Sequence, residues 1–596
     1  MTGRRIGAVP TESGTAFRVW APQARSVDVR LLDGDRLVAL DRVPGGYFTG
    51  HAGCRAGARY RMVLDGGREL PDPASRSQPD GVHGPSEVVD LGEYRWSDAG
   101  FSALPLPDNV LYELHVGAFS RGGTFSSAVE WLDDIASLGV TAVEIMPVAQ
   151  FPGRRNWGYD GVFPFAVQNS YGGARGLQHF VDECHGRGLA VVLDVVYNHL
   201  GPEGNVLPQY GPYLTDRYRT PWGPAVNLDG PDSDAVRDYF VANALQWFDA
   251  FHVDGLRLDA VHELVDRSPV PFLADLSEAA AEASARLGRP CWLIAESAAN
   301  DPRTVTPRAA GGLGMDAQWN DDFHHAAHVA VTSEHSGYYA DYTGARDVAR
   351  AMAQGFVYQG QRSSFRRRRH GAPSEAIDPS RFVVFAQNHD QVGNRADGAR
   401  LSTLVPPDRL FLLAALVLLA PGLPLLFMGE EYGETAPFAY FVDHSDPELL
   451  DAVRRGRAEE HQESAATAPD PADPETFERA VLDHAGSAAE PHRVLRERYR
   501  SLASLRAQEP ALRRSTRAAT TAAAWGPVVG LTRSHGPTTL LAYFNLSDTR
   551  QTVPLPEPGC WRELLVEERP GHGGAVELGP WAFRLLRAET PGEGGR

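Results

Sequence analysis

The sequence predicts a three-part α/β chain, in which a central (β/α)8 barrel of the TIM type is flanked by an N-terminal and a C-terminal β-sandwich. Short apolar segments alternate with amphipathic ones from about residue 108 onward, and strand-like alternation dominates before and after that region. No GxGxxG motif follows the first strand, which disfavours a doubly wound sheet, the alternative architecture. We expect the N-terminal sandwich at 1–100, the barrel with its insertions at 101–512 and the C-terminal sandwich at 513–596.

Strand-like alternation marks the N-terminal part. Residues 17–22 and 27–31 place apolar side chains at every second position, and glycine-containing turns follow at 33–34, 44–46 and 65–67. This pattern is typical of a small β-sandwich of accessory type. Its role stays open between a glycan-binding module and a packing domain.

The central part contains eight candidate strands, of which 317–320 is the weakest. They lie at residues 110–116, 142–148, 189–196, 253–259, 292–296, 317–320, 382–387 and 423–428. Such nearly continuous apolar strands, separated by helices, indicate a parallel sheet buried on both faces. Helical spacing over 125–138 predicts a helix after the first strand. Eight strand–helix units in about 400 residues fit a closed barrel with insertions.

The segment 410–428 has nineteen uncharged residues and is the most membrane-like stretch of the sequence. Pro421, Gly422 and Pro424 divide it into two runs that are too short to span a bilayer. We therefore expect a buried helix followed by a buried strand.

The C-terminal part returns to β character at 540–544 and 581–586. Before it, residues 454–490 are rich in Ala, Glu, Asp and Pro, and 493–505 have helical spacing. We interpret 454–490 as an insertion before the last helix of the barrel.

The composition excludes several chemistries. All 57 residues counted as Lys+Arg are arginine, so no lysine is available for Schiff-base catalysis, a pyridoxal phosphate anchor or a phosphate-loop contact. The net charge of −19 argues against nucleic acid as a partner. A reducing cytoplasm is expected, because residues 1–14 lack the apolar core of a signal peptide and the cysteines form no CxxC pair. The four cysteines are Cys54, Cys184, Cys291 and Cys560.

Polar residues stand where the candidate strands end. In a (β/α)8 barrel these ends share one face, and that face carries the reacting groups. The strand-end residues are Asp194 with Asn198 and His199, Arg257 with Asp259, Glu296, and His389 with Asp390. Each alone could be a helix cap, an ion-pair partner or a satisfied core residue. Their occurrence together predicts a catalytic site.

Two of these residues have opposed surroundings. Arg257 and Asp259 are two positions apart on a strand, so both side chains point the same way and the cation keeps Asp259 ionised, as a nucleophile requires. Glu296 follows an apolar strand, which favours the protonated form that a general acid requires. Such a pair is what glycoside cleavage needs. His389 and Asp390 would bind sugar hydroxyls and balance the charge of the transition state.

Four segments resemble the signature segments of the α-amylase superfamily, in the same order along the chain. They lie at 194–199, 255–259, 294–296 and 388–390. The resemblance implies Asp259 as the nucleophile, Glu296 as the acid/base and Asp390 as the stabiliser of the transition state. It also implies that Arg257, His199 and His389 line the cleavage subsite, with structural support from Asp194 and Asn198.

Further segments resemble the malto-oligosyltrehalose trehalohydrolase family over nearly the whole chain. These segments lie at 18–22, 112–119, 157–160, 198–205, 319–325, 388–395 and 427–432. The resemblance implies a retaining hydrolase that cleaves the α-1,4 bond next to the terminal trehalose of maltooligosyl trehalose. The implied sugar contacts are His262, Asp321, His325 and Asn394, with Tyr159 stacking on a sugar face unless it is a core aromatic residue. Ser297-Ala298-Ala299 departs from the polar loop expected after Glu296 and leaves fine specificity open.

Two other functions stay open at the level of sequence. One is a glucan transferase of the glycogen branching type, and the other is an inactive glycan-binding barrel, against which the three carboxylates argue. No cofactor, metal or membrane contact is expected, and no dedicated calcium loop is evident. The expected partner is the oligosaccharide substrate alone, and the oligomeric state stays open.

Overall fold

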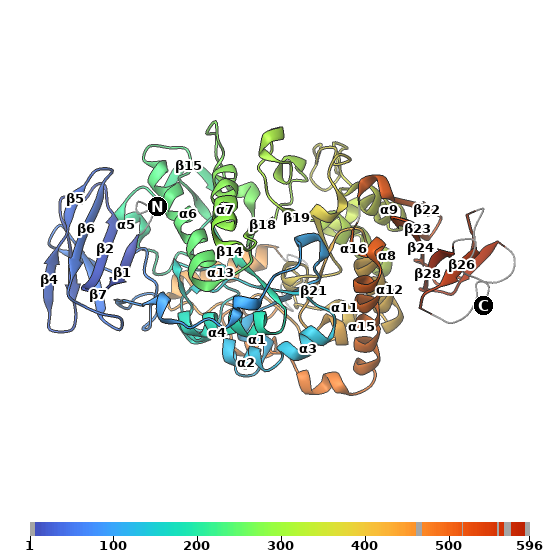
Figure 1. Cartoon of the computed structure of the whole chain (residues 1–596), viewed down its shortest axis with the longest axis horizontal. Coiled ribbons are helices and arrows are strands. Elements are labelled where there is room, and N and C mark those ends of the chain that lie inside the picture. The colour runs from blue at the N-terminus through green and yellow to red at the C-terminus, as the bar shows by residue number, and fades with distance from the viewer. Residues whose placement is uncertain (1–5, 461–467, 515, 557–559, 566–573, 590–596) are drawn as a thin grey trace.

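The computed structural model describes residues 6–460, 468–514, 516–556, 560–565 and 574–589. Eight parallel strands close into a barrel, as predicted. Around the barrel they are β10 (Leu111–Leu114), β11 (Ala142–Ile145), β14 (Ala190–Val195), β17 (Gly255–Leu258), β18 (Trp292–Ala295), β19 (Ala317–Trp319), β20 (Phe382–Phe385) and β21 (Leu423–Phe427). Figure 1 shows the barrel in the middle of an elongated molecule, with a β-rich part at each end. The (β/α)8 prediction, including its weak sixth strand, is confirmed.

An apolar layer fills the barrel. Because side chains alternate along a strand, every second residue points inward, and strands in register place these residues at one level. Leu111 thus lies beside Ala142, Val192 beside Gly255, and Phe385 beside Leu425. All of these residues are fully buried. The next inward position of each strand lies one level closer to the carboxyl ends.

Helices surround the barrel. The α-helices are α1 (Val116–Phe119), α2 (Phe125–Val129), α3 (Leu132–Ser137), α4 (Gly173–Gly186), α5 (Leu207–Tyr210), α6 (Ser233–Phe251), α7 (Phe272–Leu287), α8 (Asp321–Thr332), α9 (Ala345–Gln354), α10 (His389–Gly393), α11 (Leu401–Leu404), α12 (Pro407–Leu419), α13 (Pro447–Glu460), α14 (Pro474–Glu478), α15 (His492–Gln508) and α16 (Pro510–Arg513). Two small excursions, β12 (Ala149–Gln150) with β13 (Phe163–Val167) and β15 (Leu214–Thr220) with β16 (Gly223–Val226), follow β11 and β14.

Two helix predictions can be compared directly with the structure. The segment 410–428 forms the buried helix α12 and the buried strand β21, as expected. No helix in the described part of the chain is long and apolar enough to cross a membrane. The single helix expected over 125–138 is wrong, because α2 ends at Val129 and α3 begins at Leu132. Trp131, at this break, stacks its ring on His484 at 4.1 Å, a tertiary contact that helical spacing does not reveal.

The N-terminal strands form two sheets that pack on each other. One contains β1 (Gly7–Thr11), β2 (Gly14–Trp20), β6 (Tyr47–Ala52) and β5 (Asp41–Val43), and the other contains β4 (Arg36–Ala39), β3 (Val27–Leu31), β7 (Arg59–Leu64), β8 (Arg68–Leu70) and β9 (Ser86–Glu87). Phe17 of the first sheet meets Tyr60 of the second edge to face, with ring centroids 5.1 Å apart.

The C-terminal strands also form two sheets. The larger one contains β22 (Thr520–Trp525), β23 (Val528–His535), β24 (Thr538–Asn545), β28 (Phe583–Glu589) and β26 (Cys560–Glu563), and the smaller one pairs β25 (Gln551–Pro554) with β27 (Ala575–Leu578). Tyr543 joins the sheets by donating its hydroxyl to the Pro554 carbonyl at 2.8 Å.

Some sequence predictions fall partly outside the described residues. The prediction that 1–14 is not a signal peptide includes residues 1–5, and the insertion predicted at 454–490 includes residues 461–467; neither of these two stretches is described. Cys54, Cys184 and Cys291 carry free thiols, and the side chain of Cys560 is outside the described set.

Candidate active site

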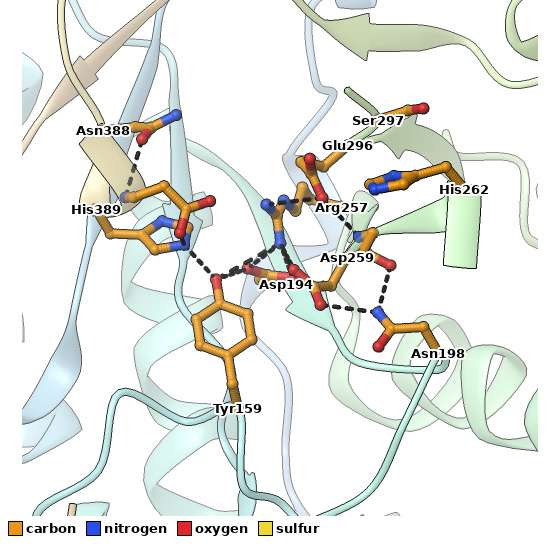
Figure 2. Close-up of polar contacts among 12 residues, drawn as sticks. Tyr159, Asp194, Asn198, Arg257, Asp259, His262, Glu296, Ser297, Asn388 and His389 are labelled. Carbon is orange, nitrogen blue, oxygen red and sulfur yellow. Dashed lines mark hydrogen bonds and ion pairs between the residues drawn. The ribbon is translucent and has the colours of Figure 1, made fainter. Parts of the chain in front are cut away.

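A layer of charged side chains lies directly above the apolar layer of the barrel. It follows from strand alternation, because each polar residue is the inward position after an apolar one. Asp194 comes two residues after Val192 on β14, and the register places it beside Arg257 of β17. Glu296 likewise comes two residues after Ile294 of β18. Figure 2 shows these side chains converging on one point.

The Arg257 guanidinium lies at that point and is fully buried. Its Nη1 is 2.8 Å from Oδ2 of Asp194 and 2.9 Å from Oδ1 of Asp259, while its Nη2 is 3.8 Å from Oε2 of Glu296. The Trp319 ring covers the guanidinium at 4.3 Å. Three carboxyl groups from neighbouring strand ends thus share one permanent cation.

Asp259 is held in the ionised form. Burial alone would raise the pKa of this carboxyl, but Arg257, His199 and Asn198 together bring the pKa below its ordinary value. Asn198 donates from Nδ2 to Oδ2 of Asp259 at 2.8 Å and to its main-chain oxygen at 2.7 Å. This fixed, charged oxygen pair can act as a nucleophile.

Glu296 has the opposite character. Burial raises the pKa of its carboxyl, and the nearby charges of Asp259 and Asp390 add to the rise against the opposing effect of Arg257. Its Oε2 accepts the backbone N–H of Ala260 at 2.6 Å, which fixes its direction. Glu296 can therefore carry a proton at a pH where Asp259 has none.

His389 and Tyr159 form the opposite wall. The Tyr159 hydroxyl donates its proton to Oδ2 of Asp194 at 2.6 Å and accepts the Nε2–H of His389 at 2.7 Å. The two rings stack at 5.3 Å, and Tyr159 is half-buried and packs against the hydrophobic core. Asp390, at the start of α10, lies 3.6 Å from Nε2 of His389 and is 39% exposed, so its oxygens can reach a ligand.

The remaining predicted contacts surround this centre at different depths. His199 donates from Nε2 to the Tyr159 carbonyl at 3.0 Å, and its ring stacks on the half-exposed Trp222 at 4.4 Å. His262 lies beside Glu296 in Figure 2. Asp321 opens α8, and burial, with Glu296 and Asp390, raises the pKa of Asp321 to about 8.

Two predicted contacts lie farther from the charged centre. His325, on α8, is buried and has its Nδ1 3.2 Å from the Tyr342 hydroxyl. Asn394 directly follows α10 and donates its backbone N–H to the Asp390 carbonyl at 2.8 Å, while its side chain is exposed. The structure brings most of the other predicted residues together, but it places neither the His325 nor the Asn394 side chain in the network around Arg257.

Sequence reasoning missed two acids in this layer. Glu113 of β10 binds His389 twice, accepting the backbone N–H at 3.0 Å and facing Nδ1 at 2.5 Å. Glu144 of β11 lies in register with Glu113, and burial raises the pKa of its carboxyl well above the ordinary value, which keeps it neutral. The signal was present, because a buried acid inside an otherwise apolar strand needs a partner. Within the described segments, no group of three or more His, Cys, Asp or Glu side chains is arranged to hold a metal ion.

Comparison with known proteins agrees with this geometry. A family model for the alpha amylase catalytic domain matches residues 70–219. The chain is 47% identical to malto-oligosyltrehalose trehalohydrolase from Rhizobium sp. (strain M-11), covering 86% of this chain and 88% of that protein. It is also 47% identical to the protein of the same name from Saccharolobus solfataricus, over 76% and 79% of the two chains. A crystal structure of a Salmonella typhimurium protein superposes with a TM-score of 0.89 at 38% identity, covering 98% of this chain and 99% of that one. This extent of identity shows that the chain belongs to the malto-oligosyltrehalose trehalohydrolase family.

Proposed function

We propose that the chain hydrolyses the α-1,4-glucosidic bond next to the terminal trehalose of maltooligosyl trehalose, with retention at the anomeric carbon. The observation that carries this proposal is the sharing of Arg257 by two carboxyl groups of opposite character. Asp259 lies at 2.9 Å from the cation with a lowered pKa, and Glu296 lies at 3.8 Å with a raised one. The names of the relatives support the choice of substrate.

The reaction has two steps. First, an Asp259 oxygen attacks the anomeric carbon while the Glu296 proton passes to the glycosidic oxygen, so trehalose leaves and a glycosyl ester forms on Asp259. Then Glu296, now a carboxylate, takes a proton from water, and the resulting hydroxide displaces Asp259 from the same carbon. Two inversions give net retention, for which the two carboxyl groups should be about 5–5.5 Å apart.

The surrounding residues position the sugar at the cleavage point. His389, Asp390 and Arg257 place charges around the carbon that becomes positive in the transition state. Tyr159 and His199 offer ring faces or edges to the sugar there. His262, Asp321, His325 and Asn394 are assigned to the outer contacts. We assign the chemistry to 101–512 and treat 1–100 and 513–596 as flanking domains.

The test is incubation with maltotriosyl trehalose. Release of trehalose and maltotriose, with the α-anomer of maltotriose formed first by NMR, supports the proposal. Asp259→Asn should lower kcat by roughly 10⁴-fold or more, while the exposed control Asp133→Asn should not change it. Loss of iodine staining of amylose without new reducing ends would indicate a transferase instead. Unchanged turnover in Asp259→Asn would refute the assigned mechanism.

A further inference from the structure

A polar groove lies where the N-terminal sandwich meets the barrel. It has a volume of about 660 Å³, and the residues assigned to catalysis do not line it. One wall is the loop 79–83 of the N-terminal part, and the other comes from loops that follow β11, β14 and β21. Its volume is in the range of sites that bind small ligands.

Hydrogen bonds and ion pairs hold the walls of this groove in place. Glu203 is buried, and its carboxyl is 3.1 Å from Nε2 of His83 and 3.2 Å from Nδ1 of His444. Opposite, Asp443 accepts the backbone N–H of Arg154 at 2.8 Å and pairs with Arg155 at 2.5 Å. The His83–Glu203 contact thus joins the N-terminal part to the barrel loops, and the other contacts hold those loops together around the groove.

The groove lies close to one side of the catalytic centre. His444 of the groove has Nε2 3.8 Å from Oδ1 of Asp160, and Asp160 follows Tyr159 in the chain. In Figure 2, Tyr159 lies on the opposite side of Arg257 from Glu296. Glu296 protonates the oxygen of the leaving trehalose, so the chain that becomes attached to Asp259 extends toward the Tyr159 side.

The charges of the groove suit a neutral ligand. Asp80 and Asp443 supply carboxylate acceptors, while His83 and Arg154 supply donors. A polyanion would be repelled by the carboxylates, and an apolar ligand would offer no hydrogen bond to the exposed His83 and Arg154 side chains. A chain of sugar hydroxyls satisfies donors and acceptors alike.

We propose that this groove binds the distal glucose units of the maltooligosyl chain, so that the N-terminal domain sets the preference for chain length. The inference rests on the proposed function. It gives the flanking sandwich a role in binding substrate.

The experiment compares maltosyl trehalose with maltopentaosyl trehalose as substrates for the full chain and for the double variant His83→Ala/Arg154→Ala. Two lost hydrogen bonds should lower kcat/KM for the long substrate by roughly tenfold. The value for the short substrate should stay unchanged, because a short chain does not reach the groove. The matched control is His51→Ala/Arg121→Ala, two exposed residues of the same types away from the groove.

Equal effects on both substrates, or none on either, would overturn the proposal. A second measurement is independent of turnover: calorimetric titration of maltoheptaose into Asp259→Asn, with and without the two groove substitutions. Weaker binding with the groove substitutions supports the groove, and equal binding refutes it. If the wild-type chain releases no trehalose from either substrate, the proposed function fails, while the maltoheptaose titration still tests the groove.

Discussion

From the contact between Glu113 and His389 we predict how far the pKa of His389 changes in the variant Glu113→Gln. Burial would lower the pKa of His389, but the Glu113 carboxylate, with Asp390, raises it to about 9. Glutamine keeps the shape and the hydrogen bond to the backbone but removes the charge. The pKa of His389 should then fall toward its ordinary 6.5, while Asp390 keeps part of the rise. A fall of about two pH units corresponds to roughly 3 kcal/mol.

The same change in pKa should alter the free energy of unfolding. The pKa of His389 is higher in the folded state than in the unfolded state, so its stabilising contribution is complete below pH 6.5 and is lost as pH rises through about 9. Glu113→Gln should therefore be less stable than wild type by roughly 3 kcal/mol near pH 6, with the difference shrinking toward pH 9.

Carbon NMR of histidine labelled at Cε1 would measure the titration directly, with the His389 signal assigned from His389→Gln. At a pH of about 7.5 the variant ring would be neutral, and loss of a charge-assisted contact to substrate should lower kcat/KM roughly 10- to 150-fold. Glu113→Asp, which keeps the charge, should recover part of the raised pKa. A His389 signal that still titrates near pH 9 in Glu113→Gln would refute the reasoning.

Two further predictions concern the carboxyl pair. Arg257→Gln leaves buried carboxyl groups without their cation, so it should lower the free energy of unfolding, measured in urea, by about 3–5 kcal/mol. It should also move the acid limb of the kcat/KM profile to higher pH, because Arg257 lowers the pKa of Asp259. An unmoved acid limb would contradict this. Glu296→Gln should lower kcat/KM by roughly 10²–10⁴-fold and abolish the alkaline limb, because the raised-pKa acid is gone. The loss should be smaller for an aryl glycoside whose leaving group needs no proton, and an equal loss would count against Glu296 as the acid.

The sequence could predict the strand-end residues because the alternation of side chains along a strand and the apolar residue two positions before each of them are both visible locally. A buried strand has a period of two, so an acid two positions after an apolar inward residue must enter the same interior. This logic reaches Asp194, Arg257 and Glu296. It does not reach the pair of Glu113 and His389, which are 276 positions apart and meet only because β10 and β21 close the barrel. The break at Trp131 has the same origin, since its partner His484 lies far along the chain.

At Arg257 the site needs an arginine and could not use a lysine. A guanidinium presents Nη1 and Nη2 in one plane, so it contacts Asp259 at 2.9 Å through one and Glu296 at 3.8 Å through the other. At an effective dielectric constant of about 20, the attraction to the cation is stronger at the shorter distance by about 1.4 kcal/mol. This energy corresponds to a difference of about one unit between the pKa values of the two carboxyl groups. Asn198 adds its hydrogen bond to Asp259. A single ammonium on a flexible stem would not fix two unequal distances, so Arg257 adds to the pKa difference that burial and the neighbouring groups give the nucleophile and the acid.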